Sequence, residues 1–142
     1  ITSKSGGGQP VSMENIRSVR KVLDRFGIPL YLDACRFAEN DYFIKTREMG
    51  YEDKSVKTIV RELMSLADGC TVSAKKDGLV NIGGLLFTID PVLAHKEKDL
   101  LILTEGYPTY GGLAGHDLEA MAVGFEEVLN EDYLKYRLAE VR

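Results

Sequence analysis

Short apolar runs alternate with amphipathic helical patterns along this chain, and this alternation constrains the fold more than any other feature. Apolar residues recur at helical spacing in 13–26 and again in 56–64. Ser12 and Ser55 precede these segments as N-cap residues, and Gly27 ends the first. Runs too short for a helix lie at 30–32, 70–72 and 85–89. The sequence therefore predicts an α/β layer structure with a mainly parallel sheet.

The remaining segments carry weaker patterns. The unbroken apolar run predicts that the strand at 30–32 is buried on both faces, and 1–3 also has the pattern of a strand. A helix is expected over 36–49, and a short one begins at Asp90-Pro91. A further apolar run follows, and the last segment is helical in pattern. A helix over 117–129 is expected to bury Leu118, Met121, Ala122, Phe125 and Leu129.

Composition excludes several classes of function. The chain has 142 residues and is 44% apolar, which suits one domain with its own core. Acidic residues outnumber basic ones by 22 to 18 and the basic ones are scattered, so nucleic acid is not an expected partner. No apolar run approaches the roughly 20 residues of a membrane span, and no leader opens the chain, so we expect a cytoplasmic protein without a membrane partner. Cys35 and Cys70 are expected to be buried free thiols, and His95 and His116 are assigned no metal.

Both ends of the sequence look cut. The chain begins within a strand pattern and without Met, and residues 133–142 stop within a helical pattern that has no cap. We therefore expect a piece of a longer protein.

Polar residues follow two of the predicted strands. Asp33 closes one and Ser73 the other, and ligands of open α/β sheets bind at the carboxyl ends of the strands. Arg36 and Lys76 follow three residues after them. Taken singly, Asp33 is explained as a cap, and Lys76, like its neighbour Lys75, as a solvated residue. Together they are the set that pyridoxal phosphate chemistry requires: a carboxylate for the pyridine nitrogen, a lysine for the aldehyde, and donors for the phosphate and the ring hydroxyl.

The glycines at 6–8 offer an alternative site. Between a strand and a helix they could hold a phosphate at the helix N-terminus. They lack the GxGxxG spacing and the lysine of a P-loop, so a flexible turn is the better interpretation, and a nucleotide-binding module is disfavoured.

Several strings are far more specific than these patterns. They resemble the β-eliminating lyases, the family of tryptophanase and tyrosine phenol-lyase, nearly from end to end: 7–12, 33–40, 42–45, 73–77 and 105–113. The resemblance implies a three-layer, mainly parallel sheet, as part of the large domain of the aspartate-aminotransferase-like pyridoxal-phosphate fold. Residues 1–142 would be a fragment of that one domain, with the flanking parts of a homotetrameric subunit absent.

The resemblance also implies roles for individual residues. Lys76 matches the lysine that forms a Schiff base with pyridoxal 5'-phosphate, and Asp33 matches the partner of the pyridine nitrogen. Arg36 matches the residue beside the phenolic oxygen of the ring, and Ser73 a phosphate ligand. The family also holds a monovalent cation, potassium or ammonium, partly by backbone carbonyls, and Asn81 matches one contributor.

The implied reaction is the cleavage of tryptophan or tyrosine by α,β-elimination to the free aromatic compound, pyruvate and ammonia. Strings at 36–40, 73–76 and 108–110 look more like tryptophanase, and those at 80–83 and 113–115 more like tyrosine phenol-lyase. The balance leans slightly to tryptophan. Tyr107 and Tyr110 suit an interface or the rim of an active site, and an ordinary surface loop fits nearly as well.

One departure from the family pattern is Lys4, which replaces an asparagine that helps to hold the phenolic oxygen of the ring. This lysine leaves a second interpretation open. The chain could be a non-catalytic relative, or a truncated fragment of such a lyase, with weak or no cofactor binding.

Overall fold

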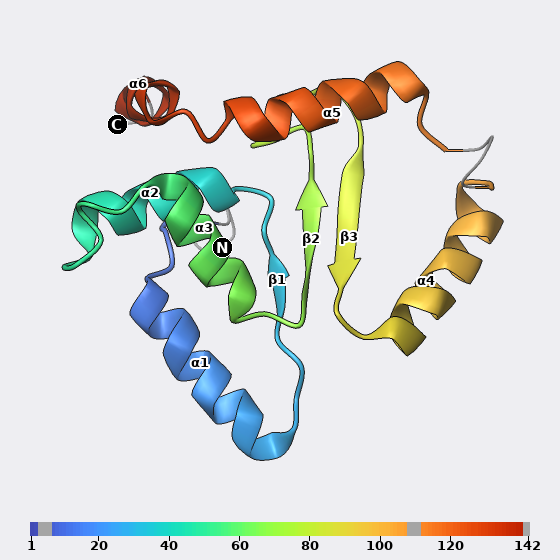
Figure 1. Cartoon of the computed structure of the whole chain (residues 1–142), viewed down its shortest axis with the longest axis horizontal. Coiled ribbons are helices and arrows are strands. Elements are labelled where there is room, and N and C mark those ends of the chain that lie inside the picture. Colours follow the sequence, from blue (N-terminus) through green and yellow to red (C-terminus); the bar gives the residue numbers. More distant parts are fainter. Residues whose placement is uncertain (3–6, 108–111, 141–142) are drawn as a thin grey trace.

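The computed structural model describes residues 1–2, 7–107 and 112–140. These residues form a mixed α/β segment in which helices lie around a small sheet (Figure 1). The elements, in chain order, are α1 (Met13–Phe26), β1 (Tyr31–Asp33), α2 (Phe37–Arg47), α3 (Val56–Ser65), β2 (Gly69–Ser73), β3 (Gly84–Thr88), α4 (Pro91–Thr104), α5 (Gly115–Glu127) and α6 (Glu131–Glu140). The expected strand at 1–3 is not formed by the described residues 1 and 2.

The three strands lie in the order β1-β2-β3. β1 runs parallel to β2, with Asp33 opposite Thr71, whereas β3 runs antiparallel to β2, with Ser73 opposite Gly84. The expectation of a mainly parallel sheet is therefore wrong for the described strands. Residues 74–83, which join β2 to β3, contain no helix and are too few for a parallel crossover, which needs about a dozen residues or more.

Side chains of β1 alternate between the two faces of the sheet. Leu32 is buried, whereas Tyr31 and Asp33 are exposed, so the expected burial on both faces is wrong. On the neighbouring strands, Thr71 and Leu86 are exposed in the same way. Among the described residues, the protein thus covers one face of the sheet and leaves the face that carries Asp33 open.

Local signals set the first helix as the sequence predicts. The hydroxyl of Ser12 accepts a hydrogen bond from the amide of Asn15 at 3.1 Å, and Gly27 ends α1 with a left-handed φ of 62°. The core lies between α1, α2, α3 and the sheet. Its fully buried side chains include Met13, Val56, Ile59 and Leu63.

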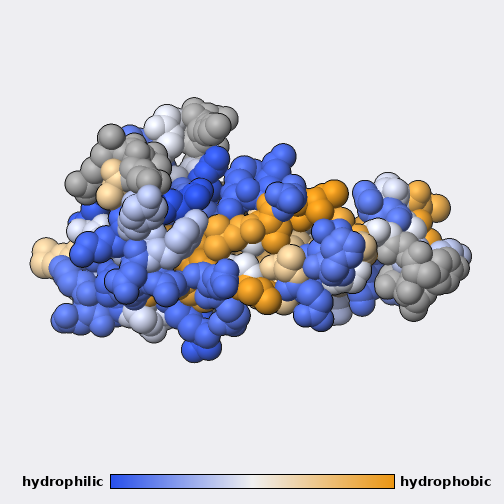
Figure 2. Space-filling model, turned by 90° about the horizontal axis from the view of Figure 1, so that it is seen from above, coloured by the Kyte–Doolittle hydropathy of each residue, from blue (hydrophilic) through white to orange (hydrophobic). Residues whose placement is uncertain are grey.

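Helix α4 is longer than the short helix expected at Pro91, because the apolar run 100–103 continues it. Asp90 caps it, with Oδ1 accepting hydrogen bonds from the amides of Val92 and Leu93. No side chain of α4 is buried, and Leu103 is 82% exposed. The helix stands beside β3 at one end of the molecule (Figure 1), and Figure 2 shows hydrophobic surface across the middle of the molecule. None of the described helices is both long and apolar enough to span a bilayer.

Helix α5 buries a different stripe from the one expected. Met121 is buried as predicted and Phe125 is half-buried, but Leu118 and Ala122 are exposed. The reason is Gly124, where an added Cβ would lie 1.9 Å from the carbonyl oxygen of Gly78. The helix therefore packs through Met121 and Gly124 against the segment that follows β2, and Val128 just after the helix joins the core.

Candidate functional site

Two of the predicted residues end neighbouring parallel strands. Asp33 is the last residue of β1 and Ser73 the last of β2, so both lie at the carboxyl edge of this strand pair, as predicted. Lys76 lies in the turn immediately after β2, where its amide donates to the carbonyl oxygen of Ser73 at 3.3 Å. The lysine and the aspartate thus come from adjacent strand ends.

The Asp33 carboxylate is held in its ionised form. Its pKa is lowered, chiefly by a hydrogen bond from the side chain of Cys35 and also by the amide of Cys35, which donates to Oδ1 at 3.2 Å. The positive charges of the amino group of Ile1 and, to a smaller extent, of Lys76 lower the same pKa further. The local explanation of Asp33 is thus partly correct, since it closes a turn, but its carboxylate also lies within electrostatic reach of Lys76.

The two lysines of the turn differ in exposure. Lys75 is exposed, whereas Lys76 is half-buried. Within the described part of the chain, no hydrogen bond or ion pair engages Nζ of Lys76. Its amine is therefore available to a ligand beside Asp33.

Arg36 and Ser73 offer donors on either side of this pair. Arg36 directly precedes α2, and its Nη1 donates to the carbonyl oxygen of Thr2 at 3.2 Å. The amide of Ser73 donates to Sγ of Cys35 at 3.1 Å. That amide is therefore occupied, and Ser73 offers its hydroxyl to a ligand.

Two buried polar residues near the site escaped the sequence analysis. Asp77 is 1% exposed, and its Oδ2 accepts hydrogen bonds from the amides of Ala38 and Glu39 at 2.8 and 3.2 Å. Burial raises the pKa of this carboxyl to about 6. One signal could have revealed the need for such a cap: Arg36, which precedes α2, is not a capping residue.

The second of these residues is Asn40, which is fully buried. Its Oδ1 accepts from the hydroxyl of Thr2 and from the amide of Val11, both at 2.9 Å, and its Nδ2 donates to the carbonyl oxygen of Val11. It thus fixes both ends of the glycine-rich segment. No local pattern predicts this role.

The other expected positions are less informative. Asn81 is exposed in the segment between β2 and β3, and its part in binding a cation stays a prediction. Lys4 and Tyr110 lie outside the described residues, and Tyr107 is 52% exposed. Within the described ranges, no group of three or more histidine, cysteine, aspartate or glutamate side chains could hold a metal ion.

The thiols match their expectation only in part. Both Cys35 and Cys70 are free, but Cys70 alone is buried and Cys35 is half-buried. The partial exposure of Cys35 follows from its place in the turn between β1 and α2, beside Asp33.

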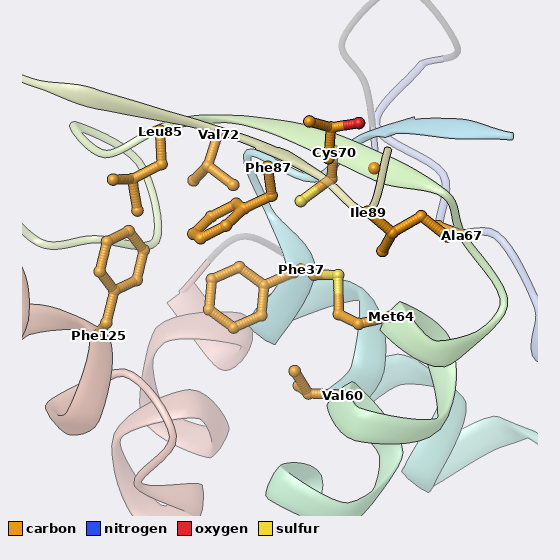
Figure 3. A pocket seen from close by; sticks show the side chains of 12 residues that line it. Phe37, Val60, Met64, Ala67, Cys70, Val72, Leu85, Phe87, Ile89 and Phe125 are labelled. Carbon is orange, nitrogen blue, oxygen red and sulfur yellow. The ribbon is translucent and has the colours of Figure 1, made fainter. Parts of the chain in front are cut away.

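A large apolar cavity of about 580 Å³ lies elsewhere, on the helix-covered face of the sheet (Figure 3). Phe37, Phe87 and Phe125 point into it, together with Met64 from α3. None of the five predicted site residues lines it. Because its walls carry almost no polar group, the cavity lacks the donors and charges that the chemistry of the strand ends requires.

Comparison with known proteins decides the family. The model of the β-eliminating lyase family matches residues 1–140. The chain belongs to this family. Tryptophanase from Salinibacter ruber is 63% identical over 142 residues, which cover 100% of this chain and 30% of that protein.

Tyrosine phenol-lyase from Intrasporangium calvum is 55% identical over 142 residues, again 100% of this chain and 30% of that protein. A probable tryptophanase from Aeropyrum pernix is 53% identical over the same shares. The resemblance of the motifs to β-eliminating lyases is thereby confirmed. The chain spans about 30% of the length of these relatives.

Proposed function

We propose that the protein to which this chain belongs is a pyridoxal-phosphate-dependent lyase that cleaves an aromatic amino acid. Water and the amino acid would yield the free aromatic compound, pyruvate and ammonia. The observation that carries this proposal is that Lys76 and an ionised Asp33, whose pKa the lysine helps to lower, follow or end two neighbouring parallel strands. Membership of the β-eliminating lyase family supports it.

The residues present fit the cofactor. An ionised Asp33 can pair with a protonated pyridine nitrogen, because its carboxylate is exposed and its pKa is lowered by Cys35 and Lys76. Nζ of Lys76 can hold the aldehyde carbon, and the hydroxyl of Ser73 can donate to the phosphate. Arg36 would serve the phenolic oxygen. When bound there, the cofactor supplies an electron sink for the bonds to Cα of the substrate.

The residues of the chain would then have distinct tasks. Once the substrate amine has taken its place at the aldehyde carbon, Nζ of Lys76 would be free to accept the proton from Cα of the amino acid. Asp33 would stay ionised and keep the proton on the pyridine nitrogen, because the hydrogen bonds from Cys35 above all favour its charged form. Arg36 is anchored by the carbonyl oxygen of Thr2, which limits the directions in which its remaining N–H groups can donate.

Tryptophan is the favoured substrate. The tryptophanase from Salinibacter ruber is 63% identical to the chain, against 55% for the tyrosine phenol-lyase from Intrasporangium calvum. Tyrosine stays the alternative, because both kinds of relative align over the whole chain. We extend the proposal to a homotetrameric subunit with this chain in a three-layer large domain, and to a potassium or ammonium ion bound partly by the carbonyl oxygen of Asn81.

One observation favours a second candidate function. Lys4 stands in place of the family asparagine beside the phenolic oxygen of the ring. A non-catalytic relative that keeps the fold, with weak or no cofactor binding, would tolerate this change.

Borohydride reduction after incubation with pyridoxal phosphate, followed by peptide mass mapping, tests the proposal. We expect stoichiometric labelling at Lys76, lost in Lys76→Ala and kept in Lys75→Ala, the matched control one residue away. Scattered labelling of exposed lysines in both the chain and the full-length subunit would contradict it. Assays of the full-length subunit with tryptophan and with tyrosine then choose between the substrates, and labelling without cleavage of either would favour the non-catalytic candidate.

A further inference from the structure

Asp33 and Lys76 lie on separate loops, and the chemistry proposed for them requires a fixed distance between these loops. The first loop, residues 34–36, joins β1 to α2, and the second, residues 74–78, follows β2. Within the second loop, the amide of Lys76 donates to the carbonyl oxygen of Ser73, and the carbonyl oxygen of Lys76 accepts from the amide of Leu79, both at 3.3 Å. These bonds stay within the second loop, and the bond from the amide of Ser73 to Sγ of Cys35 joins the first loop only to the end of β2, so another contact must hold the Lys76 turn itself.

Asp77 makes this connection through three hydrogen bonds. Its amide donates to the carbonyl oxygen of Cys35 at 3.3 Å. Its carboxylate Oδ2 accepts from the amides of Ala38 and Glu39, in the first turn of α2, at 2.8 and 3.2 Å. Asp77 is thus the covalent neighbour of Lys76 and is bound on both sides of Arg36, at Cys35 and at the start of α2.

The strength of this connection follows from burial and charge. The side chain is 1% exposed, so its hydrogen bonds do not compete with bulk water. A carboxylate at a helix N-terminus also satisfies amides that the helix itself cannot, and it faces the positive end of the helix dipole. Since Arg36 provides no side-chain cap, α2 depends on Asp77 for these bonds.

We propose that Asp77 is a positioning residue, which holds the Lys76 turn against the Asp33–Arg36 loop by capping α2 from the far loop. This inference rests on the function proposed for Lys76 and Asp33. It adds that, besides the bond from the amide of Ser73 to Sγ of Cys35, the spacing between these two residues is set by a third residue that touches neither cofactor nor substrate.

Titration of the Asp33 carboxyl, followed by NMR in the protein without any cofactor, tests the inference. Cys35, the amino group of Ile1 and Lys76 all lower the pKa of Asp33, and of these only Lys76 lies on the second loop, so a Lys76 turn that moves away raises that pKa. Asp77→Ala is expected to raise it in the same direction as Lys76→Met, which removes the charge outright. If the turn stayed in place, removing the negative charge of Asp77 would lower the pKa of Asp33. A rise in that pKa therefore indicates displacement of the turn, and a fall indicates a direct effect of the lost charge.

Two conservative variants sharpen the result. Asp77→Asn keeps an oxygen acceptor of the same length and is expected not to raise the pKa of Asp33. Asp77→Glu keeps the charge and the cap but is one methylene longer, so it is expected to displace the turn and raise the pKa even if Asp77→Ala fails to fold. Exchange of the amide protons of Ala38 and Glu39 should be about tenfold faster or more in Asp77→Ala, because they lose a charged acceptor.

The inference is overturned if Lys76→Met raises the pKa of Asp33 while folded Asp77→Ala and Asp77→Glu do not. It is equally overturned if Lys76→Met has no effect, because the two residues are then not coupled. None of these measurements uses pyridoxal phosphate. Failure of the labelling at Lys76 would therefore contradict the proposed function without deciding the role of Asp77.

Discussion

Nε of Arg137 donates a hydrogen bond to Oε1 of Glu39 at 2.6 Å across a separation of 98 residues in sequence. The pair joins α6 to α2, whose first turn is also capped by Asp77. Glu39 is 8% exposed, so it depends on this partner more than a surface carboxylate would.

Arg137→Ala should therefore lower the free energy of unfolding by about 1–2 kcal/mol, a value reduced by the partial exposure of the arginine. The matched control is Arg61→Ala on α3, where the arginine is exposed. Urea denaturation of both variants measures the difference. Equal midpoints for the two would show that α6 contributes nothing through this pair.

Asp41 predicts a dependence of stability on pH. It is fully buried, and burial raises its pKa to about 8. Between the ordinary pKa of an aspartate, about 4, and this raised value, the folded protein keeps a proton on Asp41 that the unfolded chain has lost. The contribution of Asp41 to the free energy of unfolding is therefore complete below about pH 4 and is lost as the pH rises through about 8. Asp77, with a pKa of about 6, acts in the same direction at lower pH.

Asp41→Asn should accordingly gain stability relative to the unchanged protein as the pH rises from about 5 to about 9. The expected gain is several kcal/mol at most, measured by urea denaturation at both pH values. Asp53→Asn at an exposed position is the control and should show no such trend. A constant difference between Asp41→Asn and the unchanged protein would mean that Asp41 is not protonated in the fold.

Two leucines compare a core helix with the exposed helix α4. Leu63 on α3 is completely buried, whereas Leu103 on α4 is 82% exposed. Leu63→Ala should cost about 2–5 kcal/mol of unfolding free energy, because it removes buried methyl groups and leaves a cavity. Leu103→Ala should change it little in the chain of 142 residues. Thermal and urea unfolding measure both, and comparable losses would show that α4 is packed in solution.

Gly124 predicts an unusual response to alanine. In a helix interior alanine is normally more stable than glycine. At this position, however, a Cβ would lie 1.9 Å from the carbonyl oxygen of Gly78, next to the Lys76 turn. Gly124→Ala should destabilise the protein and reduce labelling of Lys76 by pyridoxal phosphate. Gly115→Ala, at the start of the same helix and with open space around its Cβ, should do neither. Stability and labelling unchanged in Gly124→Ala would show that α5 does not press on this segment.

The parts of the structure that the sequence predicted are those set by neighbouring residues. Ser12 and Gly27 bound α1, and strand ends place Asp33 and Ser73 at one edge. Burial was harder to predict, because it depends on what covers each face: Leu118 is exposed although its spacing suits a core helix. The role of Asp77 could not be predicted either, since the helix that it caps begins 40 residues earlier in the chain, at Phe37.

The antiparallel return of β3 has a consequence for how the sequence around the lysine can vary. Ser73 pairs with Gly84, and the amide of Ala74 donates to the carbonyl oxygen of Gly83 at 3.0 Å, so residues 74–83 are a loop fastened at its base. Doubling the length of a flexible loop costs only about 0.6 kcal/mol of closure entropy. Insertions just after the exposed Leu79 therefore cost little closure entropy, while Lys76, on the other side of the buried Asp77 and Gly78, keeps its place.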